Sequence, residues 1–281
     1  MDVKQRINDE QSTLWNGLAG RGWVQAQEPL DQTLKPFEDL LVLEVSSADC
    51  GGRVLDVGCG AGAITLALAQ QLGPQGHCTG IDISEVMIQR ARARAERNPT
   101  TVNFIRGDAQ THAFEPGSFD LIVSRFGVMF FEDFVAAFEN LRHAAKAGGE
   151  LRLIVWRSAS ENPFMTTAER AAAALLPNLP ARRTDGPGQF ALADERVARK
   201  ILEQSGWAEI GFRPIDAACA FAEKELVPYF STLGPVGRIL GEMDDSTRAA
   251  VIKTVRAAFE PCVHGAEVRF TAACWMIRGR A

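Results

Sequence analysis

Residues 53–73, RVLDVGCGAGAITLALAQQLG, constrain the fold more than any other stretch of this chain. A short apolar run leads into a glycine-rich turn, and the residues that follow place Ile64 and Leu68 on one helical stripe. A buried strand that passes through a glycine turn into a helix predicts a βαβ unit and therefore a parallel sheet. Gly73 is expected to end the helix as a left-handed cap, and Pro74 prevents its continuation.

The glycine turn fits two ligand-binding patterns. Gly58, Gly60 and Ala63 satisfy the dinucleotide fingerprint G-x-G-x-x-G/A, in which a pyrophosphate lies over the first turn of the helix. The same turn also fits D-x-G-x-G-x-G, with Asp56 before it and Gly62 as a third glycine. A carboxylate at that place repels a pyrophosphate and favours a ligand with a cationic end. The second pattern is preferred, although the turn alone leaves both open.

Strand-like and helix-like segments alternate after this turn as far as about residue 157. Such alternation is typical of a parallel sheet that helices cover on both faces. We therefore expect an α/β fold with a doubly wound, mostly parallel sheet. The expected core strands are residues 53–58, 77–83, 102–109, 119–127 and 150–156, and the expected helices between them are residues 63–72, 84–98 and 131–147.

Helical segments outside this alternation predict additions to the sheet domain. Residues 1–45 are expected to form an N-terminal helical segment before a domain at 46–281, with helical insertions at about 160–190 and 223–260. The N-terminal segment contains WNGLAGRGW, whose glycines disfavour a rigid helix.

Composition and charge exclude several classes of function. A net charge of −5 provides no basic field for a nucleic-acid backbone, so nucleic acid is not expected as a substrate. The charged N-terminus and the lack of an apolar run of about 18 residues predict a cytoplasmic protein without a signal peptide or membrane span. The six cysteines include no C-x-x-C pair and the four histidines show no ligand spacing, so neither a metal site nor a disulfide framework is expected.

Several separated motifs resemble those of class I S-adenosylmethionine-dependent methyltransferases, of the type that includes the ubiquinone and menaquinone biosynthesis enzymes. LDVGCGAG is similar to the family's first motif, GIDIS to the acidic end of its second strand, and GDA to the end of its third. FDLIVSRFGVMFF is similar to the segment on and after the fourth strand, and the tail from FALADERVARKILEQSGW onward resembles the last helix and hairpin. The resemblance implies a Rossmann-like, doubly wound, seven-stranded sheet that is mostly parallel and has an antiparallel last strand. It also implies methyl transfer from S-adenosylmethionine to a small, apolar or aromatic acceptor, quinone-like or a secondary metabolite.

The resemblance also implies a cofactor site at the carboxyl ends of the parallel strands. Asp56 and the glycines would border the methionine part, Asp82 would bind both ribose hydroxyls, and Asp108 would accept from the adenine amine. Structural roles stay open, because Asp56 could simply stabilise the turn, Asp108 could only end a strand, and Met87 could be helix packing. The cofactor-site candidates are Asp56, Gly58, Cys59, Gly60, Gly62, Asp82, Ile83, Met87, Asp108, Ala109, Ser124 and Trp15.

The N-terminal segment often folds over the cofactor as a lid in the resembling family, so residues 1–45 are expected to gate the site. Methyl transfer requires no universal catalytic residue, because the methyl carbon is already activated and positioning supplies much of the rate. A base is needed only for an acceptor that must lose a proton. The catalytic residue is therefore unknown, and the candidates are Arg125, His112, Tyr229 and His264.

Two other functions stay open from the sequence alone. An NAD-dependent oxidoreductase is disfavoured by Asp56, by Asp108 and by the lack of a Tyr-x-x-x-Lys pair. A non-catalytic S-adenosylmethionine-binding protein is compatible with the same cofactor motifs. The expected partners are a small-molecule acceptor and, as an open alternative, a second copy of the chain in a homodimer.

Overall fold

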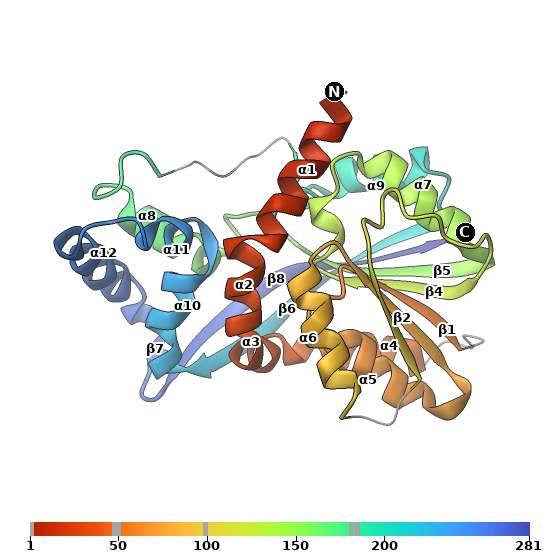
Figure 1. The fold of residues 1–281 in the computed structure, drawn as a ribbon, viewed down its shortest axis with the longest axis horizontal. Helices are drawn as coiled ribbons and strands as arrows, with labels where there is room; N and C mark the ends of the chain where they lie inside the picture. The colour runs from red at the N-terminus through yellow and green to blue at the C-terminus, as the bar shows by residue number, and fades with distance from the viewer. Residues whose placement is uncertain (1–2, 47–51, 98–100, 180–181, 183–185) are drawn as a thin grey trace.

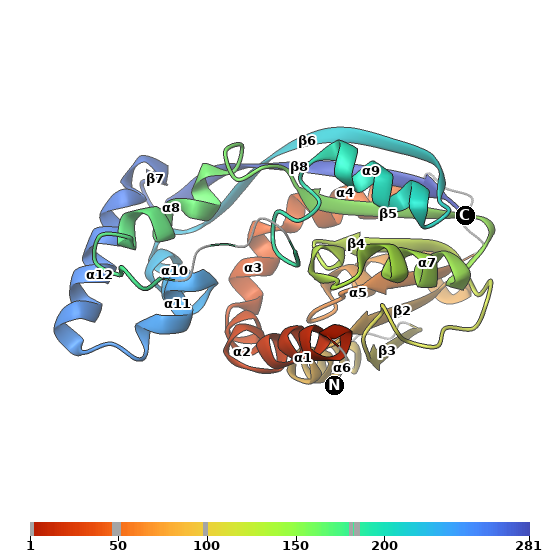
Figure 2. The same cartoon turned by 90° about the horizontal axis from the view of Figure 1, so that it is seen from above.

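One sheet runs through most of the molecule, and a helical cap (residues 163–172 and 223–262) covers its outer end (Figure 1). The N-terminal helices, red to orange in Figures 1 and 2, lie between this cap and the main body of the sheet. The three parts therefore meet near the middle of the molecule. The structure is a computed structural model that describes residues 3–46, 52–97, 101–179, 182 and 186–281.

The sheet has the expected doubly wound topology. Its strands are β1 (Arg53–Val57), β2 (His77–Asp82), β3 (Val102–Arg106), β4 (Phe119–Arg125), β5 (Ala145–Trp156), β6 (Ala208–Ala222), β7 (Val263–His264) and β8 (Glu267–Arg280). Within the described residues they follow the order β3-β2-β1-β4-β5-β8-β6, with β7 pairing to β8 off this path. β1 to β5 pair in parallel, whereas β8 is antiparallel to β5 and β6. The predicted seven-strand path with an antiparallel last strand is confirmed, and its order reverses between β1 and β4, where such sheets open a crevice.

Helices cover both faces of the sheet and extend beyond it. They are α1 (Val3–Asn16), α2 (Leu18–Gln25), α3 (Gln27–Thr33), α4 (Lys35–Ser46), α5 (Ala63–Leu72), α6 (Glu85–Ala95), α7 (Phe134–Ala144), α8 (Pro163–Ala172), α9 (Glu195–Gln204), α10 (Leu226–Thr232), α11 (Gly234–Leu240) and α12 (Asp245–Ala258), with 3₁₀ turns η1 (Gly73–Gln75), η2 (Val128–Phe130), η3 (Glu223–Glu225) and η4 (Glu260–Cys262). In Figure 1, α7 and α9 lie on one face, and α4 and α5 lie on the other. Among the described residues, no helix is both long enough and apolar enough to cross a membrane.

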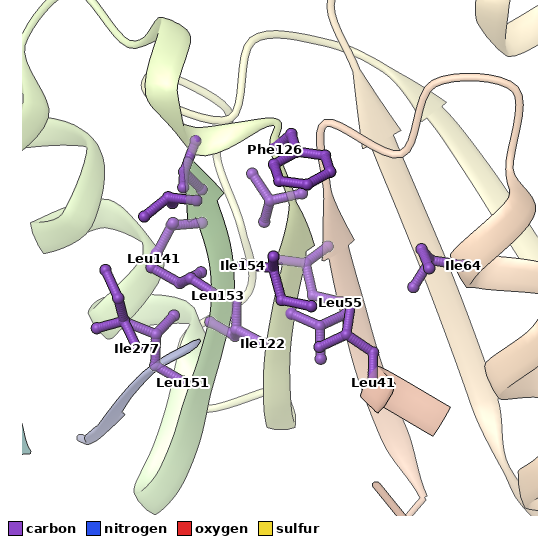
Figure 3. Close-up of a cluster of buried hydrophobic side chains, with 14 of the residues drawn as sticks. Leu41, Leu55, Ile64, Ile122, Phe126, Leu141, Leu151, Leu153, Ile154 and Ile277 are labelled. Carbon is purple, nitrogen blue, oxygen red and sulfur yellow. The ribbon is translucent and has the colours of Figure 1, made fainter. Parts of the chain in front are cut away.

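The main core lies between the strands and these two helix layers. Successive residues of a strand point to opposite faces, so Leu153 and Ile154 of β5 pack on opposite sides. Figure 3 shows Leu41 of α4 and Leu55 of β1 on the side of Ile154, and Leu141 of α7 on the side of Leu153. All five side chains are fully buried. At about 1.5–3 kcal/mol for each buried aliphatic side chain, this packing fixes the strand ends as a rigid platform.

Two helix ends differ from the sequence expectation. The helix expected to continue to residue 147 begins after its N-cap Asp133 and ends at Ala144, because Ala145 pairs with Phe119 and starts β5. Tertiary pairing here outweighs the helix propensity of the alanines. Gly73 has a φ of 67° but a ψ of −162°, so the predicted left-handed cap is wrong, and the chain continues into η1.

The prediction that glycines disfavour a helix in residues 15–23 holds only at Gly17, which separates α1 from α2. α2 is helical through Gly20 and Gly22, and both residues are buried. A Cβ at Gly20 would lie 3.0 Å from Ser84 Oγ, and one at Gly22 would lie 3.0 Å from the Thr232 carbonyl oxygen. The glycines therefore let α2 pack closely between the start of α6 and the end of α10.

The cap has a hydrophobic core of its own. Its helices α8, α10, α11 and α12 enclose a buried cluster that includes Phe164, Phe230 and Phe259, together with Val268 near the start of β8. Phe164 stacks on Phe270 of β8, with ring centroids 3.9 Å apart and nearly parallel planes. The cap is therefore a separately packed unit mounted on the extended hairpin of β6 and β8.

Candidate active site

The glycine turn after β1 is fixed against β2 by backbone hydrogen bonds. The amides of Gly58 and Cys59 donate to the Ile81 carbonyl oxygen at 2.9 and 3.1 Å. Gly58 has a φ of 67°, and a Cβ there would lie 2.5 Å from Gly127 Cα. At Gly60 the nearest atom to such a Cβ is Met87 Sδ, at 3.6 Å. The turn is thus closely packed at its start and has room beside Gly60.

Asp56 is a buried carboxylate directly before this turn. It is 2% exposed and accepts a hydrogen bond of 2.6 Å from Thr65 Oγ1 of α5. Burial raises the pKa of Asp56 to about 6, and the Thr65 hydroxyl and the positive charge of Arg125 act in the opposite direction. The negative charge of Asp82 raises this pKa further. A carboxylate in such surroundings favours a nearby cationic group.

Thr65 was missed by sequence reasoning. Its side chain is fully buried, although its hydroxyl lies in the first turns of an otherwise apolar helix. A buried polar side chain needs a hydrogen-bond partner, so a threonine on the buried face of α5 was a signal that a polar group lies opposite.

Asp82 ends β2 and connects two turns. One carboxylate oxygen accepts from the Gly60 amide and the other from the Ser84 amide, each at 2.8 Å. Burial raises the pKa of Asp82, and these two amides lower it. Each carboxylate oxygen has further acceptor capacity for a ligand. Asp82 therefore orders the glycine turn and remains available to a bound molecule.

Asp108 and Ala109 lie in the turn after β3. Asp108 accepts from the Gln110 amide at 2.9 Å and from Thr111 Oγ1 at 3.3 Å. The Asn140 side chain of α7 donates to the Ala109 carbonyl oxygen at 2.9 Å. Because β2 and β3 pair in parallel, this turn lies beside the end of β2. The structure thus places the predicted adenine-side residues next to Asp82.

Ser124 and Arg125 end β4 on the other side of the turn. The Ser124 hydroxyl is buried, donates to the Val57 carbonyl oxygen at 2.7 Å and accepts from the Gly127 amide at 3.1 Å. Arg125 donates to the Leu34 carbonyl oxygen at 3.4 Å. Burial lowers the pKa of Arg125, whereas nearby carboxylates, Asp56 among them, raise it. Ser124 stabilises the strand ends, and Arg125 adds a positive charge near Asp56.

The Cys59 side chain belongs to a packed cluster beneath the turn. A Cβ at Gly80 would lie 2.8 Å from its sulfur, and the cluster includes Ile88 and Phe104. Burial raises the pKa of Cys59 far above its ordinary value. The thiol therefore stays protonated, which disfavours a nucleophilic role. Met87, in the first turn of α6, is buried, and Ile83, which precedes this helix, is half-buried.

The junction of α1 and α2 binds the turn that follows β2. Asn16 Oδ1 accepts from the Glu85 amide at 2.8 Å, and Asn16 Nδ2 donates to the Ile83 carbonyl oxygen at 3.2 Å. Ser84 Oγ donates to the Trp15 carbonyl oxygen at 2.7 Å. The Trp15 ring packs edge-to-face on Phe130 of η2, with centroids 5.1 Å apart. Sequence reasoning included Trp15 and missed Asn16.

A second connection joins the N-terminal helices to the glycine turn. Arg94 of α6 donates to the Ala61 carbonyl oxygen at 2.8 Å and pairs with Asp31 of α3 at 2.9 Å. Asp31 also accepts from Gln27 at 2.5 Å. These residues are far apart in sequence and form no motif, so no local signal predicts the network. α3 is nevertheless anchored to the turn that carries Gly60.

The candidate catalytic residues lie in different parts of the molecule. Arg125 is near Asp56, and His112 follows β3 with its ring packed edge-to-face on Phe114. Tyr229 is in α10, where its hydroxyl lies 3.7 Å from Met165 Sδ and burial raises its pKa to about 12. His264 is exposed on β7, at the end of the cap away from β1 (Figure 1). The structure therefore brings only Arg125 and His112 to the strand ends among these four residues.

A cleft of about 450 Å³ lies between the N-terminal helices and the cap. Its lining includes Gln27 and Leu30 of α3, Arg90 of α6, and Phe221 and Tyr229 of the cap side. Arg90 Nε donates to Gln27 Oε1 at 3.0 Å. The cleft is thus connected to the glycine turn through Gln27 and its partners.

Comparisons with known proteins agree with this geometry. A family model described as a methyltransferase domain matches residues 48–208. Aklanonic acid methyltransferase DauC of Streptomyces sp. (strain C5) is 37% identical over 138 residues, which cover 45% of this chain and 63% of that protein. Demethylmenaquinone methyltransferase of Staphylococcus aureus is 36% identical over 99 residues, which cover 35% of this chain and 41% of that protein. The chain therefore spans less than two thirds of the length of these relatives.

The fold also matches solved structures. Phosphoethanolamine N-methyltransferase 2 of Haemonchus contortus, in complex with S-adenosyl-L-methionine, has a TM-score of 0.53 and 19% sequence identity. The match covers 86% of this chain and 52% of that chain. At this level of identity the likeness supports the fold.

Proposed function

Because this chain belongs to the methyltransferase domain family, we propose that it transfers a methyl group from S-adenosylmethionine to a small, apolar or aromatic acceptor. The observation that carries this proposal is the pair of carboxylates on either side of the glycine turn, the buried Asp56 and the half-buried Asp82. Burial raises the pKa of both groups, so a cationic ligand beside them would be stabilised.

The residues present fit this cofactor better than a dinucleotide. S-adenosylmethionine carries an ammonium and a sulfonium, whereas a pyrophosphate would add negative charge next to the buried Asp56 and the half-buried Asp82. The room beside Gly60, where a Cβ would meet only Met87 Sδ within 4 Å, gives a ligand access to the backbone of the turn. The site therefore suits a ligand with a cationic end and a narrow body.

Each strand end has a proposed role toward the cofactor. Asp56 and the glycine turn would bind the methionine part, and Asp82 would accept from the ribose hydroxyls. Asp108 and Ala109 would recognise the adenine edge. The remaining proposed contacts are the Cys59 backbone and the residues Gly58, Gly60, Gly62, Ile83, Met87, Ser124 and Trp15.

The cofactor supplies an activated methyl group, so the chain's own residues need only bind, orient and exclude water. We propose residues 1–45 as a lid over the domain at 46–281. The hydrogen bonds of Asn16 and Ser84 would keep this lid on the turn after β2. Arg125 would favour the ionised form of Asp56 through its positive charge.

The acceptor is proposed to lie where the strand ends, the lid and the cap meet. Aromatic side chains gather there, with Trp15 packed on both Trp23 and Phe130. The names of the two relatives, which refer to aklanonic acid and to demethylmenaquinone, support an aromatic, quinone-like or polyketide-like acceptor.

A methyl-transfer screen tests this function. The purified chain is incubated with S-adenosylmethionine labelled in its methyl group and with phenols, hydroquinones, aromatic acids and amines, and labelled products are separated. We expect transfer to at least one oxygen-bearing aromatic compound. Binding of S-adenosylhomocysteine with no transfer to any class would favour a non-catalytic cofactor-binding protein instead.

A further inference from the structure

The cleft between the N-terminal helices and the cap has walls from separate parts of the molecule. One wall comes from α2, α3 and Arg90 of α6, and the other comes from the cap side, including α10 (Figure 1). α2 meets the end of α10 closely, since a Cβ at Gly22 would lie 3.0 Å from the Thr232 carbonyl oxygen, and α3 packs on β6. The volume of about 450 Å³ accommodates a small molecule. None of the proposed cofactor contacts is among the described residues that line it.

Arg90 lines this cleft with a half-buried guanidinium that is bonded at one nitrogen. Its Nε donates to Gln27 Oε1 at 3.0 Å. Gln27 is 8% exposed, and its Nε2 donates to Asp31 at 2.5 Å, so the amide that orients Arg90 is itself fixed. The two terminal amino groups of Arg90 donate to no residue that the structure describes. A guanidinium oriented in this way is prepared to bind a planar carboxylate.

Glu225 of η3 supplies a carboxylate to the opposite wall. Its side chain is half-buried, and it forms no hydrogen bond or ion pair with any described residue, Arg90 included. Glu28 adds a second carboxylate to the lining from an exposed position. Two unpaired acids and one base favour a ligand that carries an ammonium, and the partly unpaired Arg90 favours a carboxylate on the same ligand.

Apolar side chains supply much of the remaining lining. The rings of Phe221 and Tyr229 contact each other on the cap side, with centroids 5.4 Å apart and an angle of 32° between their planes. Leu30 of α3, which is buried, lies in the other wall. These surfaces suit an apolar or aromatic body, which a free inorganic ion lacks.

We propose that this cleft is a second ligand site, separate from the cofactor residues, and that it binds an aromatic α-amino acid. The carboxylate of the ligand pairs with the terminal amino groups of Arg90, and its ammonium pairs with Glu225. The aromatic ring packs against Phe221, Tyr229 and Leu30. Because the two charges lie on opposite walls, the ligand connects the cap to α6 and, through Gln27, to α3.

Calorimetry with three probes that share one ring tests this inference. L-phenylalanine carries both charges, phenethylamine lacks the carboxylate, and 3-phenylpropionate lacks the ammonium, and each is titrated into the full chain. We expect phenethylamine to bind about tenfold more weakly than L-phenylalanine, because it loses one charge-assisted pair. We expect 3-phenylpropionate to bind most weakly, because Glu28 and Glu225 repel it.

Two substitutions each remove one end of the site. Arg90→Gln should weaken L-phenylalanine binding about tenfold and change phenethylamine binding by less than about twofold. Glu225→Gln should weaken both of these amines about tenfold without weakening 3-phenylpropionate. The matched controls are Arg97→Gln, just after α6, and Glu242→Gln in the cap, which change exposed residues and should bind all three probes as the wild type does.

Three results would overturn the inference: no binding of L-phenylalanine at up to about 10 mM, equal binding of all three probes, or an equal loss for all three probes in either site variant. The last result is expected of a disturbed cleft and not of a charge pair. Melting curves verify that the variants are folded. If Arg90→Gln is not, Arg90→Lys replaces it and should retain part of the carboxylate preference. No methyl donor is present in these titrations, so their outcome is independent of the proposed function.

Discussion

The strand ends of the sheet and the cap hold their polar groups in different ways. At the strand ends, Asp82 and Ser124 bond to backbone groups of neighbouring turns, so one short motif fixes the site. In the cap, Glu169 of a helix pairs with Arg182 of a loop. The family match includes the strand ends and stops before α10, α11 and α12. This difference supports our proposal that the strand ends bind the methyl donor.

The sharpest test of the rigid strand ends is a pair of glycine variants. Gly60→Ala should cost only about 1 kcal/mol of stability, because alanine is mildly disfavoured at the φ of 54°. The same substitution should weaken S-adenosylhomocysteine binding about 100-fold, because its methyl group would fill the room beside the turn. Gly58→Ala should instead destabilise the fold by more than about 3 kcal/mol, because its Cβ would lie 2.5 Å from Gly127 Cα. Chemical denaturation and calorimetry measure the two effects.

Gly117→Ala is the control for these variants. Gly117 has a φ of 60°, and a Cβ at this position would meet no atom within 4 Å, so the substitution isolates the backbone cost. If Gly60→Ala binds S-adenosylhomocysteine as well as Gly117→Ala does, the turn at Gly60 does not contact the cofactor.

Cofactor binding should depend on pH through Asp56. Its pKa of about 6 in the ligand-free protein means that the carboxylate is protonated at lower pH. Below about pH 6, the affinity for the ammonium of S-adenosylhomocysteine should fall, by roughly tenfold in total once Asp56 is fully protonated. The ligand-free fold should show the opposite trend and lose stability as pH rises from about 4 through 6, because the unfolded chain releases this proton first.

Asp56→Asn separates this effect from other titrations. The amide keeps an acceptor for Thr65 and cannot ionise, so affinity at neutral pH should drop about tenfold and become nearly independent of pH between 5 and 7. A wild-type affinity that is constant over the same range would argue against Asp56 as the partner of the cationic end.

The lid should contribute a smaller effect through Asn16. Asn16→Ala removes hydrogen bonds to Ile83 and Glu85, which should weaken S-adenosylhomocysteine binding by roughly threefold to tenfold. Limited proteolysis in residues 17–22 should become faster, and the ligand should protect this segment less than in the wild type. Thr13→Ala, at an exposed position of the same helix, is the control. Identical cleavage of the two variants with and without ligand would remove the support for a lid.

Tyr229 of the cap should have the smallest effect. Its pKa of about 12 leaves the phenol protonated at neutral pH, and its hydroxyl contacts only a weak acceptor, Met165 Sδ, in the described residues. Tyr229→Phe should therefore change kcat/KM by less than about twofold for an acceptor found in the screen, whereas loss of a general base typically costs about 100-fold or more. A loss of that size would return Tyr229 to the catalytic candidates.

The sheet could be predicted because its signals are local. Short apolar runs and helical hydrophobic patterns, with glycines at the turns, indicate the strands and helices from residue 53 to about 157, and the tail after them was recognised through the resemblance. The helix end at Ala144 and the helical state of Gly20 could not be predicted, because both depend on partners distant in sequence, Phe119 and Ser84.

In the candidate site, too, the residues with a local sequence signal could be predicted and those brought in from distant parts of the chain could not. Asp56, Asp82 and Asp108 were found from the sequence because each lies at a motif position on or just after the carboxyl end of a strand, and their roles toward a cofactor remain predictions. Asn16 of α1 and Arg94 of α6 contact the same turns but were not found, because only the folded chain brings them there. The cleft between the N-terminal helices and the cap carries no motif, and its walls come together only in three dimensions.

Calorimetric titration of the chain with S-adenosylhomocysteine and with NAD tests the central claim most directly. The buried Asp56 and the half-buried Asp82 beside the glycine turn predict micromolar binding of S-adenosylhomocysteine, on the order of −8 kcal/mol, and no measurable binding of NAD. Tighter binding of NAD than of S-adenosylhomocysteine would contradict the assignment of this turn to a methyl donor.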